Sequence, residues 1–184
     1  IDTGKDIVYE SGKTETIDDI DVFVEDDQPT QVSKTVSQSE KDNNRVNVEV
    51  PDVASKENSG VSQININVDE DDSEGVSEVN VTVSNDAENE EVGEVPVEDQ
   101  QDNVHGNIDV DTNNDDAVEN AEIDFKVSKN RIDEDEISRI VLFHFENGDL
   151  VETLETTYLD EVTDDRSDDY YYFESETTSF SSFT

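Results

Sequence analysis

The sequence contains no cysteine, no methionine and no tryptophan among its 184 residues. Without cysteine the chain can form neither a disulfide framework nor a thiolate metal site. It has no apolar run of about 18 residues, so the sequence predicts no membrane-spanning segment. It also begins without a methionine or a signal peptide. We therefore expect either that a leader has been removed or that the chain is a segment of a longer protein.

Basic residues are scarce as well, with 11 Lys and Arg against 52 Asp and Glu, so the formal net charge is -41. Nucleic acids and anionic lipid surfaces should repel this chain, because their binding proteins use Lys and Arg to replace counterions. We therefore predict no nucleic-acid partner. Cations, basic proteins and neutral sugars stay open as partners.

Apolar residues make up 30% of the chain, and few apolar residues with a high net charge usually indicate disorder. Here, however, the acidic residues are spread along the whole sequence rather than gathered in blocks. The Debye length falls from about 10 Å near 0.1 M salt to about 3 Å near 1 M, so concentrated salt screens the repulsion between carboxylates. The composition favours a folded protein of a halophile, and the alternative is a disordered acidic segment.

Short stretches in which apolar and polar residues alternate recur along the chain. Val46, Val48 and Val50, for example, alternate with Asn47 and Glu49. The same pattern occurs at residues 20–24, 64–68, 79–83, 108–110 and 123–127. Because successive side chains of a strand point to opposite faces, almost every stretch has one apolar and one wet face. We therefore predict an all-β fold, an immunoglobulin-like β-sandwich of short antiparallel strands.

The last third of the chain holds most of the aromatic residues and is expected to supply the best core. Residues 139–145 predict a central strand, and residues 150–158 predict the strand that returns beside it. Between them, Asn147-Gly148 predicts a two-residue hairpin turn, because both residues tolerate positive φ. Three more elements are expected around this hairpin: a helical turn at 132–138 and strands at 169–176 and 179–184.

Residues 1–45 differ from the rest, since two short strand candidates at 7–9 and 20–24 lie in otherwise polar sequence. This N-terminal extended arm has three possible roles. It is a separate segment, or the first strands of the sandwich, or a strand that pairs with a neighbouring subunit. Residues 46–184 are then the body of the sandwich.

Four stretches of the body carry a resemblance to a known family: Asn103–Asp115, Val118–Ile137, Ile140–Thr156 and Tyr170–Phe183. In their order of strand, turn, hairpin and aromatic closing strands they resemble the archaeal PGF-pre-PGF domain of cell-surface proteins. That family is richer in Trp, and it usually has Pro-Gly where this chain has Thr178-Ser179. The resemblance implies an archaeal surface location and a β-rich fold. It implies no enzymatic activity, because no catalytic residues carry over.

His105 and His144 are the only histidines. A catalytic triad or a zinc site needs a histidine with defined partners, which the sequence does not indicate for either residue. His144 lies in an alternating stretch and is predicted to be on the wet face or partly buried, while His105 lies in a loop beside Gly106. Carboxylates are so numerous that no pair stands out as general acid and base. The sequence therefore predicts that this protein is not an enzyme.

Asp109, Asp111, Asn113 and Asp115 have the alternate-position spacing with which a calcium loop begins. Calcium takes several oxygen ligands, and these side chains supply them. The pattern departs from an EF-hand at its sixth and twelfth positions, which here are both Asn rather than Gly and Glu. A solvated acidic loop is therefore the favoured interpretation, with no cofactor, and a Ca²⁺ site at these residues is the alternative.

Asn80-Val81-Thr82 is the one N-glycosylation acceptor pattern of the chain. Asn80 alternates with apolar neighbours, so its side chain should face water, as glycosylation requires. The sequence therefore predicts Asn80 as a candidate glycosylation site.

These features predict a structural cell-surface protein of a halophilic archaeon, a self-assembling subunit of an extracellular filament, sheath or surface layer. The expected partners are copies of the same chain or other surface proteins. The alternative is an adhesin or a carbohydrate- or protein-binding module of a larger surface protein. In that alternative Tyr170, Tyr171 and Tyr172 would line a groove, with Tyr171 on the opposite face from the other two.

Overall fold

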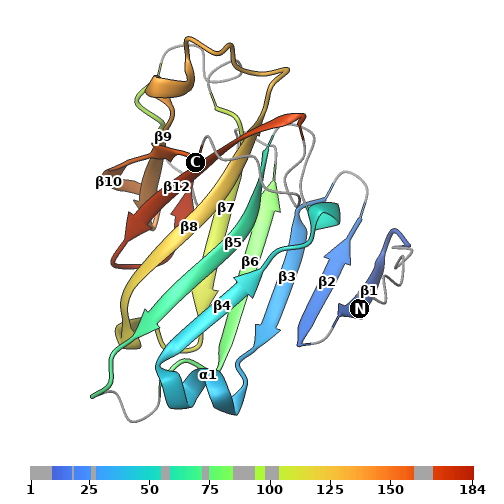
Figure 1. Ribbon diagram of the computed structural model, residues 1–184, viewed down its shortest axis with the longest axis vertical. Coiled ribbons are helices and arrows are strands. Elements are labelled where there is room, and N and C mark those ends of the chain that lie inside the picture. The colour runs from blue at the N-terminus through green and yellow to red at the C-terminus, as the bar shows by residue number, and fades with distance from the viewer. Residues whose placement is uncertain are drawn as a thin grey trace.

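The computed structural model describes residues 10–17, 19–25, 28–54, 59–71, 75–84, 94–97, 104–159 and 168–184. In these ranges the chain forms two antiparallel β-sheets that pack together (Figure 1). The predicted all-β sandwich of antiparallel strands is therefore confirmed. The strand expected at residues 7–9 lies outside the described residues.

The larger sheet has eight strands in the order β1-β2-β3-β6-β7-β13-β9-β10. Their bounds are β1 Lys13–Ile17, β2 Ile20–Val24, β3 Thr30–Thr35, β6 Glu78–Ser84, β7 Asn107–Thr112, β13 Ser182–Phe183, β9 Val141–Glu146 and β10 Asp149–Glu155. The short strand β13 pairs antiparallel with β7 on one side and with β9 on the other. The end of the described chain thus joins the two halves of this sheet.

The smaller sheet has five strands in the order β11-β12-β8-β5-β4. Their bounds are β11 Thr157–Tyr158, β12 Tyr170–Thr177, β8 Val118–Ser128, β5 Ser59–Val68 and β4 Arg45–Glu49. The helical elements are short: α1 Gln38–Asn43 and the 3₁₀ turns η1 Asp52–Ala54, η2 Asp115–Ala117 and η3 Ile137–Arg139. Helix α1 lies at the opposite end of the sandwich from the connection between β8 and β9, drawn in orange (Figure 1).

The core consists of aligned rows of β-branched side chains between the sheets. In the larger sheet Val22, Val32, Val81 and Val110 are paired in register across four neighbouring strands, and all four are buried. Burying one such side chain contributes about 1.5–3 kcal/mol. The period-two alternation of the sequence therefore becomes a continuous apolar face, which packs against the matching face of the smaller sheet.

The N-terminal strands take part in this core. Ile20 and Val22 of β2 are buried, and β3 pairs with β6 along its whole length. Strands β1, β2 and β3 are therefore part of the larger sheet.

Strand β3 was not predicted from the alternation of apolar and polar residues, because polar side chains occupy most of its buried positions. Thr30 and Lys34 are buried beside Val32. The Lys34 ammonium lies 2.5 Å from an Asp19 carboxylate oxygen and 3.3 Å from one of Glu40. Burial of a charge is tolerated when it is paired, so a lysine can stand where the alternation would require an apolar residue.

Helix α1 was not predicted, although the sequence holds its signal. Ser37 caps the helix, and its hydroxyl accepts from the Glu40 backbone N–H while the Glu40 carboxylate accepts from the Ser37 backbone N–H. This reciprocal capping box is readable as Ser-x-x-Glu. The helical turn expected at 132–138 is instead a series of turns that ends in η3 at Ile137–Arg139.

The hairpin predicted at Asn147-Gly148 is confirmed. Asn147 has φ 52° and Gly148 has φ 82°, and the flanking residues Glu146 and Asp149 are paired across β9 and β10. Positive φ at both turn residues matches the twist of the flanking strands.

Gly106, just before β7 of the larger sheet, lies close to Ser59 at the start of β5 in the smaller sheet. A Cβ atom added to Gly106 would lie 1.8 Å from the Ser59 hydroxyl oxygen. We predict that Gly106→Ala lowers the free energy of unfolding by about 1–3 kcal/mol, as overpacking does. Urea unfolding followed by circular dichroism in concentrated salt measures this loss.

The control is a double-mutant cycle with Ser59→Gly, which removes the two nearest contacting atoms. Gly106→Ala should cost clearly less in the Ser59→Gly background than in the wild type. An equal cost in both backgrounds would show that the close approach to Ser59 is not the reason for glycine at this position.

Candidate functional site

The residues predicted to bind Ca²⁺ lie along β7 and the turn that follows it. Asp109 and Asp111 both belong to this strand. One carboxylate oxygen of Asp109 accepts a hydrogen bond of 2.9 Å from the Ser182 hydroxyl. An extended strand rises about 3.3 Å per residue, so these carboxylates are spread along the strand rather than folded around one point.

Asn113 and Asp115 hold the turn after β7 together. The Asn113 side-chain oxygen accepts from two backbone N–H groups at the start of β6, at 2.7 and 3.0 Å. The Asp115 carboxylate accepts from the Thr112 hydroxyl at 2.6 Å. The structure therefore does not gather Asp109, Asp111 and Asp115 into one cluster, and calcium binding at these residues stays a prediction.

Asn80 lies on β6 with its side chain partly exposed, between buried Val79 and Val81. Its Nδ2 atom, which would carry a glycan, donates to a Glu78 carboxylate oxygen at 2.9 Å. The side chain thus points away from the core, as expected. Glycosylation itself stays a prediction.

The sequence-based expectation for His144 was wrong. Its side chain is 1% exposed and stacks on the Phe183 ring, with the ring centroids 4.7 Å apart. Its Nε2 atom lies 2.9 Å from the Ser181 hydroxyl, which donates to the Phe145 carbonyl oxygen. His144 faces the inside of the sandwich, whereas Phe145 points to the outer face of its sheet. There Phe145 is buried in a small second cluster with Val95 and Val104. Burial lowers the pKa of His144, and its role is in packing.

The three consecutive tyrosines of β12 alternate as predicted. Tyr171 is opposite Val127, whereas Tyr172 is opposite Lys126. Tyr172 is buried, and the Tyr170 ring lies 4.7 Å from the buried Lys126 ammonium. The three tyrosine side chains therefore pack against neighbouring residues and do not lie together along one open groove.

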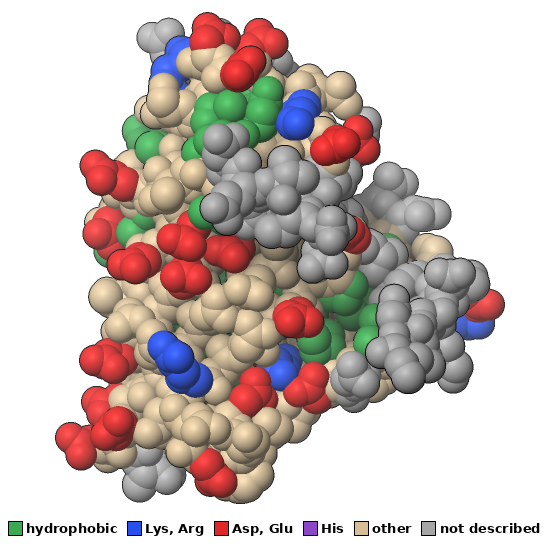
Figure 2. All heavy atoms as spheres, in the orientation of Figure 1, with side chains coloured by type: hydrophobic (Ala, Val, Ile, Leu, Met, Phe, Trp, Pro, Cys, Tyr) green, Lys and Arg blue, Asp and Glu red, His purple; other side chains and the backbone are tan. Residues whose placement is uncertain are grey.

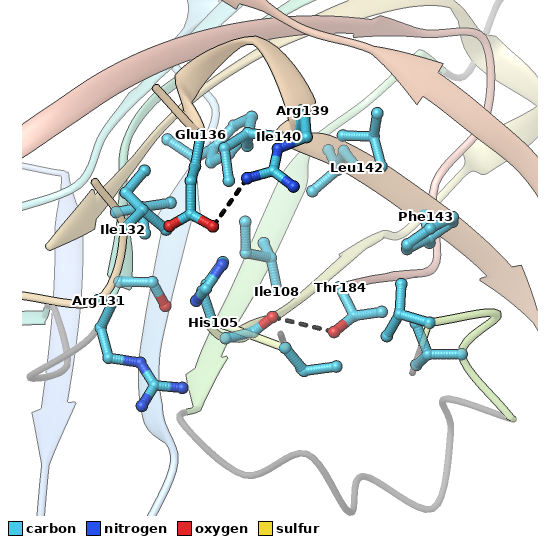
Figure 3. Close-up of a pocket in the computed structure, with 18 of the residues that line it drawn as sticks. His105, Ile108, Arg131, Ile132, Glu136, Arg139, Ile140, Leu142, Phe143 and Thr184 are labelled. Atoms are coloured by element: carbon cyan, nitrogen blue, oxygen red, sulfur yellow. Dashed lines mark hydrogen bonds and ion pairs between the residues drawn. The ribbon is translucent and has the colours of Figure 1, made fainter. Parts of the chain in front are cut away.

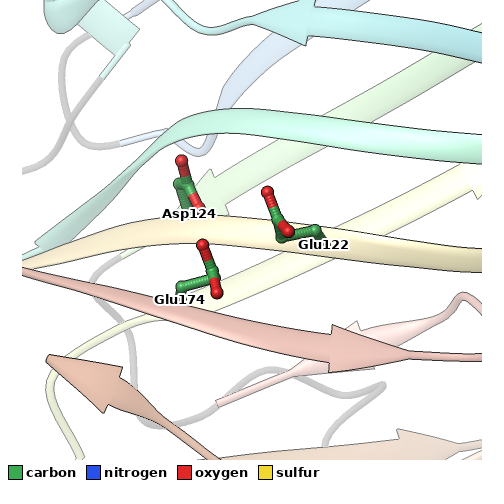
Figure 4. A group of neighbouring side chains, drawn as sticks. All are labelled: Glu122, Asp124 and Glu174. Carbon is green, nitrogen blue, oxygen red and sulfur yellow. The ribbon is translucent and has the colours of Figure 1, made fainter. Parts of the chain in front are cut away.

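Carboxylates gather on the outer face of the smaller sheet. Glu122 and Asp124 of β8 and Glu174 of β12 each have a carboxylate oxygen within 4.8 Å of the others (Figure 4). Asp124 is directly opposite Glu174 in the strand register, and Glu122 is opposite Glu176. Among the described residues, this is the one place where three or more Asp, Glu or His side chains converge in this way.

Mutual repulsion is the physical consequence of this arrangement. Burial raises the pKa of Glu174, and the negative charges of Glu122 and Glu176 raise it further. Like charges directly opposite each other destabilise a sheet. The sequence could not reveal this carboxylate cluster, because acidic residues are everywhere and only the strand register brings these particular ones together.

The two sheets end side by side in edge strands that carry exposed apolar side chains. Among the described residues β10 pairs only with β9, and Leu150 and Val151 of β10 are 41% and 52% exposed. Strand β11, which follows β10 almost directly, is the edge of the smaller sheet and exposes Tyr158. At the far end of the larger sheet, β1 pairs only with β2 within the described ranges.

A cavity of about 400 Å³ lies at the end of the sandwich near the connection between β8 and β9. Its walls include Ile108, Phe125 and Leu142 from three different strands, all of them buried. Its polar lining includes His105 and three residues of the β8–β9 connection, Arg131, Glu136 and Arg139 (Figure 3).

Some polar groups that line this cavity have a hydrogen-bond or ion-pair partner, and the Nδ1 atom of His105 has none among the described residues. Arg139 forms an ion pair of 2.9 Å with Glu136. Burial lowers the pKa of His105, and the positive charge of Arg131 lowers it further, so the imidazole is neutral at neutral pH. The buried Nδ1 atom of His105 has no hydrogen-bond partner within the described part of the chain.

Comparisons with known proteins leave the family open. No family model, no curated protein and no solved structure matches this chain. The resemblance to the PGF-pre-PGF domain therefore stays a prediction. No helix in the described ranges is both long and apolar enough to cross a membrane.

We predict that Glu174→Gln stabilises the fold at neutral pH. The raised pKa of Glu174 means that its ionised form is less favourable in the folded than in the unfolded protein. The resulting loss of stability is present above the folded pKa and disappears below the ordinary Glu value of about 4.3. The expected gain at pH 7 is about 0.2–1 kcal/mol, the range of cross-strand pairs, and should shrink in concentrated salt.

The matched control is Glu119→Gln, which removes the same charge at an exposed position of β8 outside the carboxylate cluster. Thermal unfolding at pH 7 and near pH 3.5, in dilute and in concentrated salt, tests the prediction. An equal gain from both variants would show that net charge, rather than the carboxylate cluster, sets the effect.

Proposed function

We propose that this chain is a structural, non-enzymatic surface module of a halophilic archaeon, and that copies assemble in concentrated salt through the edges of the larger sheet. The observation that carries this proposal is the edge strand β10, which leaves Leu150 and Val151 in solvent. An unpaired strand edge is a template for a strand from another chain.

The charge distribution supports a working environment of concentrated salt. Acidic side chains are scattered over the visible face of the molecule, with few basic ones among them (Figure 2). In the smaller sheet two carboxylate pairs even stand directly opposite each other, Asp124 with Glu174 and Glu122 with Glu176. Such repulsion is screened when the Debye length falls to about 3 Å, near 1 M salt.

The same charges explain why assembly should depend on salt. Strand β10 carries the exposed side chains of Asp149, Glu152 and Glu155, and a bulge at Val151 interrupts its register. Charges and bulges on an edge strand both discourage pairing with another chain. Concentrated salt removes the charge barrier, while the exposed apolar side chains remain to be buried.

A second copy is the partner that the topology favours. Within the described residues the larger sheet ends in β10 on one side and in β1 on the other, so we infer that β10 of one copy pairs with β1 of the next. Contacts between two different edges repeat head to tail and generate a ring or an open filament. That outcome matches the predicted filament, sheath or surface layer.

We predict ordered polymers above about 1 M salt that dissolve on dilution to about 0.1 M. Light scattering combined with electron microscopy on the purified chain measures this transition. A folded monomer at every salt concentration contradicts the assembly proposal.

The role of β10 as the contact between copies is tested by Val151→Lys, which places a charge at an exposed position of this edge strand. The variant should stay folded and fail to polymerise, because an edge lysine must be desolvated before another strand can pair. The matched control is Gln31→Lys, which adds the same charge at an exposed position of β3 inside the sheet. Loss of polymers in both variants, or in neither, would argue against β10 as the contact.

A further inference from the structure

The cavity at the end of the sandwich is lined by residues of the two sheets and of the connection that joins β8 to β9. Ile132 and Ile140 of this connection line the cavity together with the strand residues Ile108 and Leu142 (Figure 3). Protein interiors are normally close-packed, with few voids larger than a water molecule. A volume of about 400 Å³ is instead within the range of small-molecule pockets, roughly 300–1,000 Å³. Its apolar walls suit an apolar ligand body.

The charge of the cavity lining is opposite to that of the protein. Two of the four arginines in the chain, Arg131 and Arg139, line it, together with one carboxylate, Glu136. Arg139 pairs with Glu136 at 2.9 Å. Among the described lining residues, the charged side chains are thus two guanidiniums and one carboxylate, whose charges sum to one positive. In a chain with a formal charge of -41, this is a local exception, and guanidinium groups bind carboxylates with matched, bidentate geometry.

His105 supplies the third feature. Its Nδ1 atom is buried in the cavity lining and has no hydrogen-bond partner among the described residues. Buried polar atoms are nearly always hydrogen-bonded to protein, water or ligand. A neutral imidazole can donate one hydrogen bond from Nδ1, and a carboxylate can accept it.

We propose that this cavity binds a small organic carboxylate with an apolar chain or ring. Its apolar part would lie against Ile108, Phe125 and Leu142, and its carboxylate near Arg131 and the Nδ1 atom of His105. This binding site lies apart from the β10 edge and does not depend on the assembly of copies.

The test uses the full chain in concentrated potassium chloride, with octanoate as the probe. Titration calorimetry gives the affinity, and amide chemical shifts in NMR spectra locate the site. Val151→Lys serves as the protein if the wild type polymerises, so that failure of one proposal is not mistaken for failure of the other. Octanoate should saturably shift the amides of residues 104–108 and 131–142.

Two probes with the same tail isolate the charge. Octanol should bind about tenfold more weakly than octanoate or worse, because it lacks the charge-assisted hydrogen bonds. Octylammonium, with the opposite charge, should bind more weakly still. Equal affinity for octanoate and octanol would overturn the assignment of a carboxylate site, and the absence of any saturable shift would show that the cavity holds water only.

Three variants complete the test. Arg131→Gln should weaken octanoate binding about tenfold and leave octanol binding unchanged. The matched control Arg45→Gln, which removes an arginine from β4 of the smaller sheet away from the cavity, should leave both unchanged. Ile140→Phe, which fills the cavity, should abolish binding of both probes. If Arg131→Gln binds octanoate like the control does, the proposed site is wrong.

Discussion

The packing of two apolar sheet faces against each other is the interaction on which the rest of this structure depends. With 30% apolar residues, the chain can bury a core only if nearly every strand directs its few apolar side chains to the same side. One example is the aligned row of Val22, Val32, Val81 and Val110. Each of four neighbouring strands contributes one residue to it, and together they form a continuous apolar surface. β-Branched side chains pack well on such pleated surfaces.

The same constraint sends the acidic residues outward. Since alternate positions of a strand must be polar, the outer faces collect carboxylates, and the strand register sets some of them opposite each other, as with Asp124 and Glu174. The fold therefore combines a core of ordinary chemistry with an outer surface whose repulsion depends on ionic strength. Salt is then expected to control both the stability of the sandwich and the approach of one copy to another.

A few polar side chains depart from the pattern of apolar residues inside and polar residues outside. Lys34 and His144 point into the core and are satisfied there, by Asp19 and by Ser181 respectively. His105, in contrast, is partly buried beside a cavity, and its buried Nδ1 atom has no hydrogen-bond partner within the described residues. A buried polar atom with a partner contributes to the fold, whereas one that lines a cavity without a partner is available to water or to a ligand.

The amino-acid sequence by itself determined the fold class, most of the strands and the β9–β10 hairpin, because these depend on local alternation and on the positive φ of Asn147 and Gly148. It also held the capping box of Ser37 and Glu40, which marks the start of helix α1. Only the tertiary structure decided which side chains meet. The carboxylate cluster around Glu174 and the cavity beside His105 join residues far apart in the chain, and the strand order leaves β10 at the edge of the sheet that the described residues form. Long-range strand order creates them, and a period-two pattern shows which face a residue occupies but not which strand will be its neighbour.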